Sequence, residues 1–198
     1  MSELKLFGRW DWNVEVKDAG LKRYINLNPI VIPRTYGRYS QIRFGKEKMN
    51  IVERLITRMM VPGHKGKKHL ISSARCVGKT DKIIKIIKET LEIIESKTKK
   101  NPIEVLVRAI ENSAPLEEPL SYQIGGIIAR TAVIISPQRR VDIAIRNIVN
   151  SCYRRKVGFA KMKDLLAEEI IAAANNDISK SYALKERERI EKEAEGAR

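Results

Sequence analysis

The chain has 198 residues, of which 39 are Lys or Arg and 24 are Asp or Glu, so its net charge at pH 7 is +15. With 43% hydrophobic residues it is long enough for one ordinary core, and an aromatic content of only 6% is typical of a helical, charge-rich protein. No apolar run approaches the ~18–20 residues of a membrane span, and charges interrupt the N-terminus where a signal peptide would be apolar. These observations predict a soluble cytoplasmic protein with no membrane partner.

The excess positive charge is concentrated in two segments. Residues 34–79 carry 12 Lys and Arg against 2 Asp and Glu, and residues 136–163 carry 8 against 1. Charge that is local and of one sign is typical of a surface that meets a polyanion, whereas charge that serves general solubility is spread along the chain. This pattern predicts nucleic-acid binding before any motif is considered.

Cysteine and histidine are too sparse for a metal site. Cys76 and Cys152 are far apart and form no CxxC pair, and His64 and His69 are the only histidines. A structural zinc site needs four such ligands at close spacing. The sequence therefore predicts no metal and no cofactor, and the scarcity of cysteine favours a reducing compartment.

No arrangement of side chains indicates catalysis. The acid pairs at 117–118 and 168–169 lie in turn-like or helix-surface contexts, so nothing places two carboxylates across a pocket. Residues 78–80 are Gly-Lys-Thr, which ends a phosphate-binding P-loop, but Ser73 stands where that motif needs an earlier glycine. We therefore predict no catalytic residue, although the start of the following helix can still bind a backbone phosphate.

The chain begins irregularly and continues into a segment that we call the basic arm, residues 34–49. Residues 1–33 show little periodicity beyond one short helix expected near 21–25. The arm interleaves cations with three aromatic rings, a pattern typical of RNA binding because cations meet phosphates and aromatic faces stack on unpaired bases. For each ring the alternative stays open that it packs the arm against the core. The rings belong to Tyr36, Tyr39 and Phe44.

Helical periodicity dominates the rest of the chain. The cleanest pattern is the isoleucine-rich stripe of residues 81–96, where apolar side chains recur every three or four positions. Start and stop signals predict further helices after a cap at Asn50, after the cap and proline at 101–102, after 136–137, and before 175–177. The charged tail from residue 178 is expected to form a loosely attached helix. The predicted fold class is all-α: a helical bundle of about six helices with one protruding β-hairpin and a basic N-terminal extension.

The β-hairpin is predicted at about residues 117–135. Apolar and polar residues alternate on both sides of Gly125 and Gly126, and a Gly-Gly pair suits a two-residue turn because both turn positions can need φ > 0. The expected register pairs Ile124 with Ile127, Tyr122 with Ala129 and Leu120 with Thr131. Because an isolated two-stranded ribbon is only marginally stable, we expect the hairpin to project from the body and to be held at its base or by a partner.

The order of short motifs along the chain resembles that of the small-subunit ribosomal protein seven family, in its archaeal and eukaryotic form. The motifs are GRY at 37–39 with RF at 43–44, IVERL at 51–55 with two methionines at 59–60, GK at 78–79, NPIEVLV at 101–107, GG at 125–126, SPQRR at 136–140 with AIR at 144–146, AEEII at 167–171, AAAN at 172–175 and SYA at 181–183. The resemblance covers most of the chain and implies a helical body with one protruding hairpin, in agreement with the periodicity.

The resemblance also implies a function and partners. It implies a structural constituent of the small ribosomal subunit that binds the 3′ major domain of the rRNA directly, nucleates assembly of the subunit head, and lies near the exit site beside tRNA and mRNA. It further implies contacts with ribosomal protein eleven and other head proteins. The chain then divides into an N-terminal extension with the arm, residues 1–49, and a helical rRNA-binding domain, residues 50–198.

Charge pattern and resemblance together predict the binding residues. The residues expected to bind rRNA are Arg34, Arg38, Tyr39, Arg43, Lys46, Lys48, Lys65, Lys67, Lys68, Arg75, Gly78, Lys79, Arg139, Arg140, Arg146, Arg154, Arg155 and Lys156. The hairpin residues implied to lie near tRNA and mRNA are Tyr122, Gly125, Gly126 and Arg130.

One departure from the family and two rival functions remain. Residues 63–77 look like an insertion that begins with a basic loop at 63–68, so either Gly66-Lys67 or Gly78-Lys79 plays the role of the family's Gly-Lys signature, and the spacing favours the second. The first rival function is a free nucleic-acid-binding regulator, which would bind duplex DNA comparably. The second is a P-loop ATPase or GTPase, which Ser73 weakens.

Overall fold

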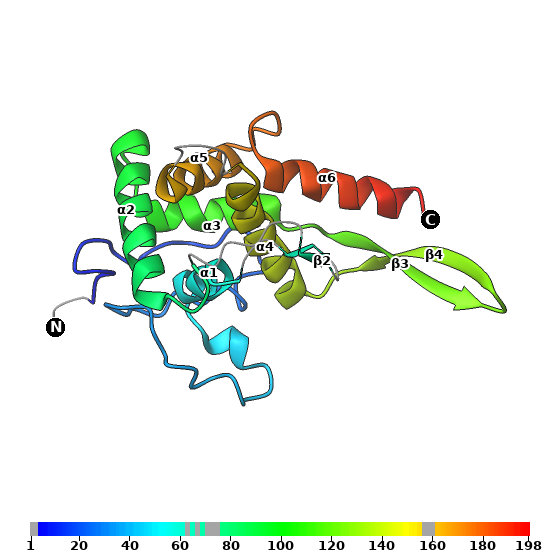
Figure 1. Ribbon diagram of the computed structural model, residues 1–198, viewed down its shortest axis with the longest axis horizontal. Helices are drawn as coiled ribbons and strands as arrows, with labels where there is room; N and C mark the ends of the chain where they lie inside the picture. The colour runs from blue at the N-terminus through cyan, green and yellow to red at the C-terminus, as the bar shows by residue number, and fades with distance from the viewer. Residues whose placement is uncertain (1–3, 62–63, 66–67, 70–75, 156–160) are drawn as a thin grey trace.

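The computed structural model describes residues 4–61, 64–65, 68–69, 76–155 and 161–198 (Figure 1). These residues form six α-helices, one short 3-10 helix and two antiparallel pairs of strands. In chain order the elements are η1 (Gly45–Lys48), α1 (Ile51–Met59), β1 (His64–Lys65), β2 (Lys68–His69), α2 (Thr80–Thr98), α3 (Pro102–Ser113), β3 (Glu117–Ile124), β4 (Ile127–Ile134), α4 (Pro137–Arg155), α5 (Met162–Ala174) and α6 (Tyr182–Glu195).

Local signals begin the helices where the sequence predicts. The side chain of Asn50 accepts a hydrogen bond from the backbone N–H of Val52 at 2.9 Å and so caps α1. Asn101 accepts in the same way from Ile103 at 3.0 Å, with Pro102 in the first turn of α3. These two helix starts are confirmed, and α2, α4 and α5 also lie where the apolar spacing predicts them.

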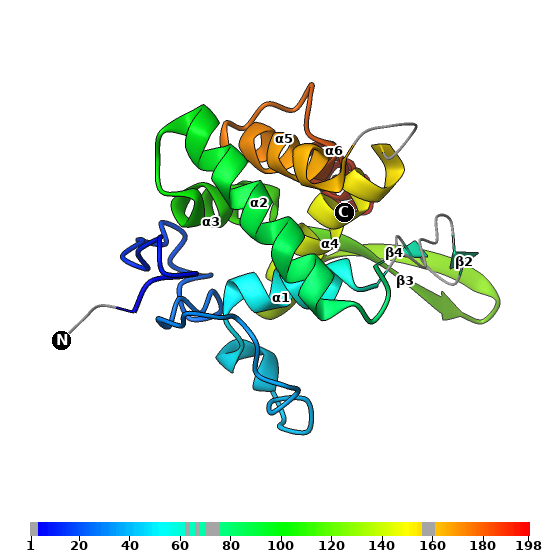
Figure 2. The same ribbon diagram turned by 60° about the vertical axis from the view of Figure 1, so that its left-hand side comes forward.

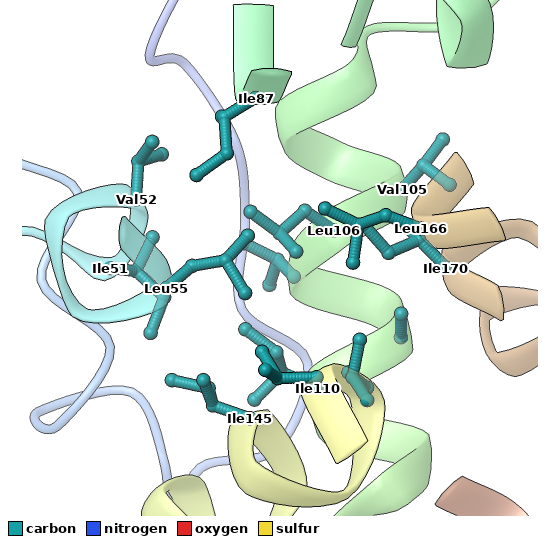
Figure 3. Packing of buried hydrophobic residues seen from close by; sticks show 14 of the residues in the cluster. Ile51, Val52, Leu55, Ile87, Val105, Leu106, Ile110, Ile145, Leu166 and Ile170 are labelled. Atoms are coloured by element: carbon teal, nitrogen blue, oxygen red, sulfur yellow. The ribbon is translucent and has the colours of Figure 1, made fainter. Parts of the chain in front are cut away.

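One hydrophobic core lies between the helices. The central helix is α3, which contacts α2, α4, α5 and α6. Figure 3 shows Leu55 of α1, Leu106 of α3 and Ile145 of α4 directed into the same interior, with Ile87 of α2 and Ile170 of α5 beside them. All five side chains are at least 98% buried. The core therefore joins five helices and sets the positions of everything on their outer faces.

The start of the chain packs against this core. Leu6, Trp10 and Leu21 are buried in the same cluster as the helix residues. The short helix predicted near residues 21–25 is wrong: this stretch forms successive hydrogen-bonded turns, in which the N–H groups of Leu21 and Ile25 donate to the carbonyls of Asp18 and Leu21. The domain boundary predicted after residue 49 stays a prediction.

The predicted hairpin is confirmed in its bounds and its register. Ile124 pairs with Ile127, Tyr122 with Ala129 and Leu120 with Thr131. Both turn residues have positive φ, 54° at Gly125 and 92° at Gly126, which is why glycine suits this turn. Figures 1 and 2 both show β3 and β4 projecting from the helical body.

The hairpin is held at its base by α6. The carboxylate of Glu191 accepts from the N–H of Leu116 at 3.1 Å, and Arg198 pairs with Glu117 at 2.6 Å. The expectation that the C-terminal helix is loosely attached is wrong. Its residues Ala183 and Leu184 are fully buried, because α6 packs against both α4 and β3.

A buried carboxylate fastens α6 to the body. Glu169 of α5 is fully buried, and it accepts hydrogen bonds from Ser151 at 2.6 Å, from Ser181 at 2.8 Å and from the N–H of Ala183 at 2.9 Å. The expectation that residues 168–169 both lie on a helix surface is therefore right for the exposed Glu168 and wrong for Glu169. Helical periodicity did not reveal this position because a carboxylate is seldom buried.

The basic segment before α2 also differs from the loop that we expected at residues 63–68. Its described residues form a short antiparallel pair, with His64 opposite His69 and Lys65 opposite Lys68.

The helical bundle with a β-hairpin is thus confirmed, while the two strand pairs make "all-α" an incomplete description. Among the described residues, no helix is both long and apolar enough to cross a membrane.

Candidate nucleic-acid interface

Asp142 joins the two basic segments of the sequence. Its carboxylate pairs with Arg54 of α1 at 2.9 Å and with Lys46 of the basic arm at 3.1 Å. Burial acts to raise the pKa of Asp142, but hydrogen bonds and charges from Arg54 and Lys46 outweigh it and lower the pKa. The carboxylate therefore stays ionised and holds the arm, α1 and α4 together.

A cationic cavity of about 400 Å³ lies beside this junction. Four of its lining side chains are cations, and one is an acid, Asp142. The cations come from both basic segments of the sequence, so the fold brings together charges that lie about 100 residues apart. The remaining lining residues are mostly small or polar. The cavity is lined by Lys46, Arg58, Ser136, Gln138, Arg139, Asp142, Ile143 and Arg146.

Two of the lining arginines, Arg58 and Arg146, repel each other electrostatically. Burial and then the charge of Arg146 lower the pKa of Arg58, and Asp142 only partly opposes this. The buried Nε of Arg58 has no hydrogen-bond partner among the residues that the structure describes. An unpaired buried donor beside a second cation costs free energy unless an anion occupies the space between them. The cavity is therefore chemically suited to a phosphate group.

The remaining cavity arginine is already paired. Arg139 lies exposed on α4 and donates two hydrogen bonds to the carboxylate of Glu118, at 2.7 and 2.8 Å. These bonds raise its pKa. Arg139 therefore lies at the predicted interface, but in the isolated chain its charge is offset by the hairpin.

Its neighbour Arg140 has a structural role. Arg140 is 8% exposed, and it donates to the carbonyl of Pro115 at 3.2 Å and to the carboxylate of Asp18 at 2.9 Å. Because its guanidinium is used to tie α4 to two loops, we leave Arg140 out of the interface proposed below. Adjacent arginines on a helix point in directions about 100° apart, and the sequence does not say which one is buried.

The two arginines at the end of α4 also differ from each other. Arg154 is exposed, with its guanidinium carbon 4.7 Å from the centre of the Tyr182 ring. Arg155 is half-buried and pairs with the buried Glu169 at 3.0 Å. Arg154 is thus available to an anion, whereas Arg155 stabilises the network around Glu169.

The basic arm projects below α1 as a light-blue segment in Figures 1 and 2. Its cations Arg38, Arg43 and Lys48 are exposed. Arg34 is half-buried and pairs with Asp81 of α2 at 2.8 Å. Tyr39 is half-buried. The arm therefore presents several cations on the side of the molecule that also carries α1.

Gly78 and Lys79 are exposed just before α2 begins, so the predicted Gly-Lys signature lies at a helix N-terminus. The predicted residues Lys67, Arg75 and Lys156, and the alternative Gly-Lys site at 66–67, lie outside the described residues. Lys65 and Lys68 are described only through their place in β1 and β2. The choice between the two Gly-Lys sites stays a prediction.

The hairpin offers a surface of different character. Tyr122, Gly125, Gly126 and Arg130 are exposed as predicted for contacts with other molecules. Arg130 is the only charged residue between residues 119 and 136. The outer part of the hairpin is therefore nearly uncharged and presents mainly polar and apolar surface.

Sequence reasoning missed residues that complete the interface. Arg58 is absent from the binding residues that the sequence predicts, and so are Asp142 and Glu118, the partners of the cations. Nothing in one-dimensional spacing indicates these pairings, since Glu118 and Arg139 lie 21 residues apart in different elements. Within the described ranges, no cluster of three or more metal-ligating side chains is found.

Comparison with known proteins shows the family to which the chain belongs. A family model described as "Ribosomal protein S7p/S5e" matches residues 21–198 of the chain. The chain is also 51% identical, over 199 residues, to a protein named "Small ribosomal subunit protein uS7" from Nanoarchaeum equitans (strain Kin4-M). That match covers 99% of this chain and 100% of the relative.

Proposed function

Because this chain belongs to the ribosomal protein S7p/S5e family, we propose that it binds the 3′ major domain of small-subunit rRNA directly, through the basic arm and the cationic cavity. Membership makes the chain a structural, RNA-binding component of the small ribosomal subunit, located in the ribosome in the cytoplasm, and not an enzyme. The proposal adds the part of the rRNA that is bound and the residues that bind it.

The observation that carries the proposal is the cationic cavity. Arg58 and Arg146 lie close enough for one charge to lower the pKa of the other, and Lys46 and Arg139 line the same space. Bringing like charges together costs free energy in the isolated chain, and a phosphate group removes that cost when it binds. Rigid helices hold these cations in register, so the cavity supports binding to a folded RNA backbone.

The test is a salt series with two polyanions. We expect the full chain to bind a transcript of the 3′ major domain tightly, and to keep most of this affinity at salt concentrations where binding to duplex DNA of equal length is lost. Equal affinities with parallel salt slopes would instead support a free nucleic-acid-binding regulator. No binding of the transcript at low salt would overturn the proposal outright.

A pair of matched variants locates the interface. Arg146→Ala removes a cavity cation, and we expect it to lower transcript affinity about fivefold and to reduce the salt slope by about one. The control is Lys100→Ala. Lys100 is exposed just after the C-terminus of α2. Because α2 is about 28 Å long, Lys100 lies well away from Lys79, the predicted binding residue at the N-terminus of this helix. Equal losses in both variants would mean that net charge alone drives binding.

We further propose that this binding nucleates assembly of the subunit head, and that the chain contacts ribosomal protein eleven and other head proteins. The support is the family, together with a cavity whose cations come from the arm, α1 and α4. Order-of-addition reconstitution tests this role. We expect other head proteins to bind the transcript only after this chain has bound.

The hairpin is proposed to lie near the exit site, beside tRNA and mRNA. Its support is its projection from the body and the exposure of Tyr122 and Arg130. A photo-crosslinking residue at position 122 should label tRNA or mRNA in assembled subunits, and the same residue at position 100 should not. Labelling of rRNA alone at position 122 would contradict this placement.

A further inference from the structure

Two aromatic rings of the basic arm lie exposed instead of packing against the body. Tyr36 is 82% exposed and Phe44 is 62% exposed. By contrast, Tyr39, the ring that we named as an RNA ligand, is half-buried, and its backbone carbonyl lies against Gly45. Two exposed rings in one short segment form apolar surface of the kind that marks an interaction site.

The backbone at both rings has a conformation that costs conformational free energy. Tyr36 and Phe44 have φ values of 52° and 57°, in the left-handed region that side-chain-bearing residues seldom adopt. Lys99 and Asn176 adopt it where helices end, and Phe7 packs against the core. Among the described residues, only Tyr36 and Phe44 combine this backbone conformation with a ring that is more than half exposed, and Phe44 adopts it at the N-cap of η1. Strain without a packing gain is typical of a binding site.

A guanidinium lies over each ring. The guanidinium carbon of Arg34 is 4.5 Å from the centre of the Tyr36 ring, and that of Arg43 is 5.3 Å from the centre of the Phe44 ring. An arginine covers only one face of a ring, and the exposed fractions of both residues show that much of each remains accessible. The Phe44 pair thus presents an aromatic face beside a positive charge, the two groups that a nucleotide needs for its base and its phosphate, whereas Arg34 shares its charge with Asp81.

The arm is shaped before any ligand binds. At one end, the N–H and hydroxyl of Thr35 both donate to Glu53 of α1, at 2.8 and 2.7 Å. At the other end, Lys46 pairs with Asp142 of α4. Hydrogen-bonded turns fill the space between these anchors. Gly45 allows its backbone to lie close to that of Tyr39, since a Cβ at position 45 would lie 2.2 Å from the carbonyl oxygen of Tyr39. Little order has to be gained when a ligand stacks on the rings.

We infer that Tyr36 and Phe44 stack on unpaired bases of the bound RNA, with Arg43 contacting an adjacent phosphate and Arg34, which pairs with Asp81, holding the Tyr36 ring from its other side. The inference rests on the proposed function and deepens it, because it names single-stranded nucleotides as the ligand of the arm. Bases inside a duplex already stack on each other, so free aromatic faces select loops, bulges and ends.

The test replaces each ring by leucine in the full chain. Tyr36→Leu and Phe44→Leu keep apolar bulk but remove the aromatic face, and we expect each to lower affinity for the 3′-major-domain transcript about tenfold. The salt slope should not change, because no cation is lost. Neither variant should bind a fully paired RNA of the same length more weakly than the wild type does. The matched control is Ile32→Ala, which removes an exposed apolar side chain outside the ring pair.

The outcomes separate this inference from the proposed function. A wild-type chain that fails to bind the transcript contradicts the proposed function itself. A wild-type chain that binds, with leucine variants that bind equally well, overturns the stacking and leaves the proposed function standing. Equal losses on looped and fully paired RNA would overturn it as well. An unchanged circular-dichroism spectrum and melting temperature in the variants show that the fold is intact.

Discussion

Glu118 accepts two hydrogen bonds from Arg139, with Oε1 2.7 Å from Nε and Oε2 2.8 Å from Nη2. This fork joins the first strand of the hairpin to the first turn of α4, so it fixes the base of the hairpin to the wall of the cationic cavity. It also offsets the charge of Arg139 in the isolated chain. If Arg139 binds an rRNA phosphate as proposed, Glu118 competes with the RNA for this guanidinium and weakens RNA binding.

This competition predicts that the chain binds RNA more tightly when Glu118 loses its charge. Glu118→Gln removes the competing charge, so transcript affinity should rise about threefold and the salt slope should steepen by up to about one, as Arg139 neutralises a further phosphate. The measurement is filter binding across a salt series. Glu188→Gln on α6 removes an acid of equal charge whose ion-pair partner is Lys192. If both variants gain equally, the effect is one of net charge and not of the fork.

The neighbouring arginines of α4 should separate into a binding role and a structural role. Arg140→Ala leaves the Pro115 carbonyl without its donor and Asp18 without its partner, so the free energy of unfolding should fall by about 2–4 kcal/mol. Arg139→Ala removes an exposed pair and should cost under about 1 kcal/mol. Urea denaturation followed by circular dichroism measures both. Equal losses would show that Arg140 is not the structural member.

Asp142→Asn should destabilise the chain in a pH-dependent way. The substitution removes the charge that faces Arg54, a residue only 4% exposed, and we expect a loss of about 1–2 kcal/mol at pH 7, reduced by solvent because Asp142 is 39% exposed. The pKa of Asp142 is lowered on folding, so its ionised form stabilises the fold above the unfolded pKa of 3.8. This contribution disappears as the pH falls through the still lower folded pKa.

The check is a pair of stability curves. The difference in unfolding free energy between wild type and Asp142→Asn should stay constant from about pH 5 to 7 and shrink below about pH 4. A difference that grows on acidification would mean that the pKa of Asp142 is raised in the fold and that its ion pairs do not govern it.

Glu169→Gln should loosen the C-terminal helix. An amide keeps one acceptor oxygen but loses the charge that faces Arg155, so the free energy of unfolding should fall by about 2–4 kcal/mol. Amide hydrogen exchange should accelerate in α6 more than in α2, because Ser181 and Ala183 bond directly to this carboxylate. The exposed neighbour Glu168→Gln is the control. Uniform acceleration across all helices would contradict a local fastening.

Local signals predicted much of the fold correctly. Asn50 and Asn101 cap their helices through side-chain bonds that span two residues, and the Gly-Gly turn fixes the hairpin register between adjacent strands. These features depend on neighbours in the chain, so a single sequence contains them. The wrong expectations concern how one element packs against another. Whether α6 is attached depends on Glu169 of α5 accepting hydrogen bonds from Ser181 and Ala183, and the sequence of a charged helix does not show this buried partner.

The features of the candidate interface also divide into those that the sequence predicts and those that depend on the tertiary structure. By itself the sequence determined that the cations are concentrated in two segments, that one of these carries aromatic rings, and that the motif order resembles a ribosomal family. Only the tertiary structure decided which cations reach solvent and which bond within the chain. It placed Arg58 beside Arg146, buried Arg140, and displayed Tyr36 and Phe44 while half-burying Tyr39. The physical reason is that charge is a sum over residues, whereas exposure and pairing depend on directions in space that only packing sets.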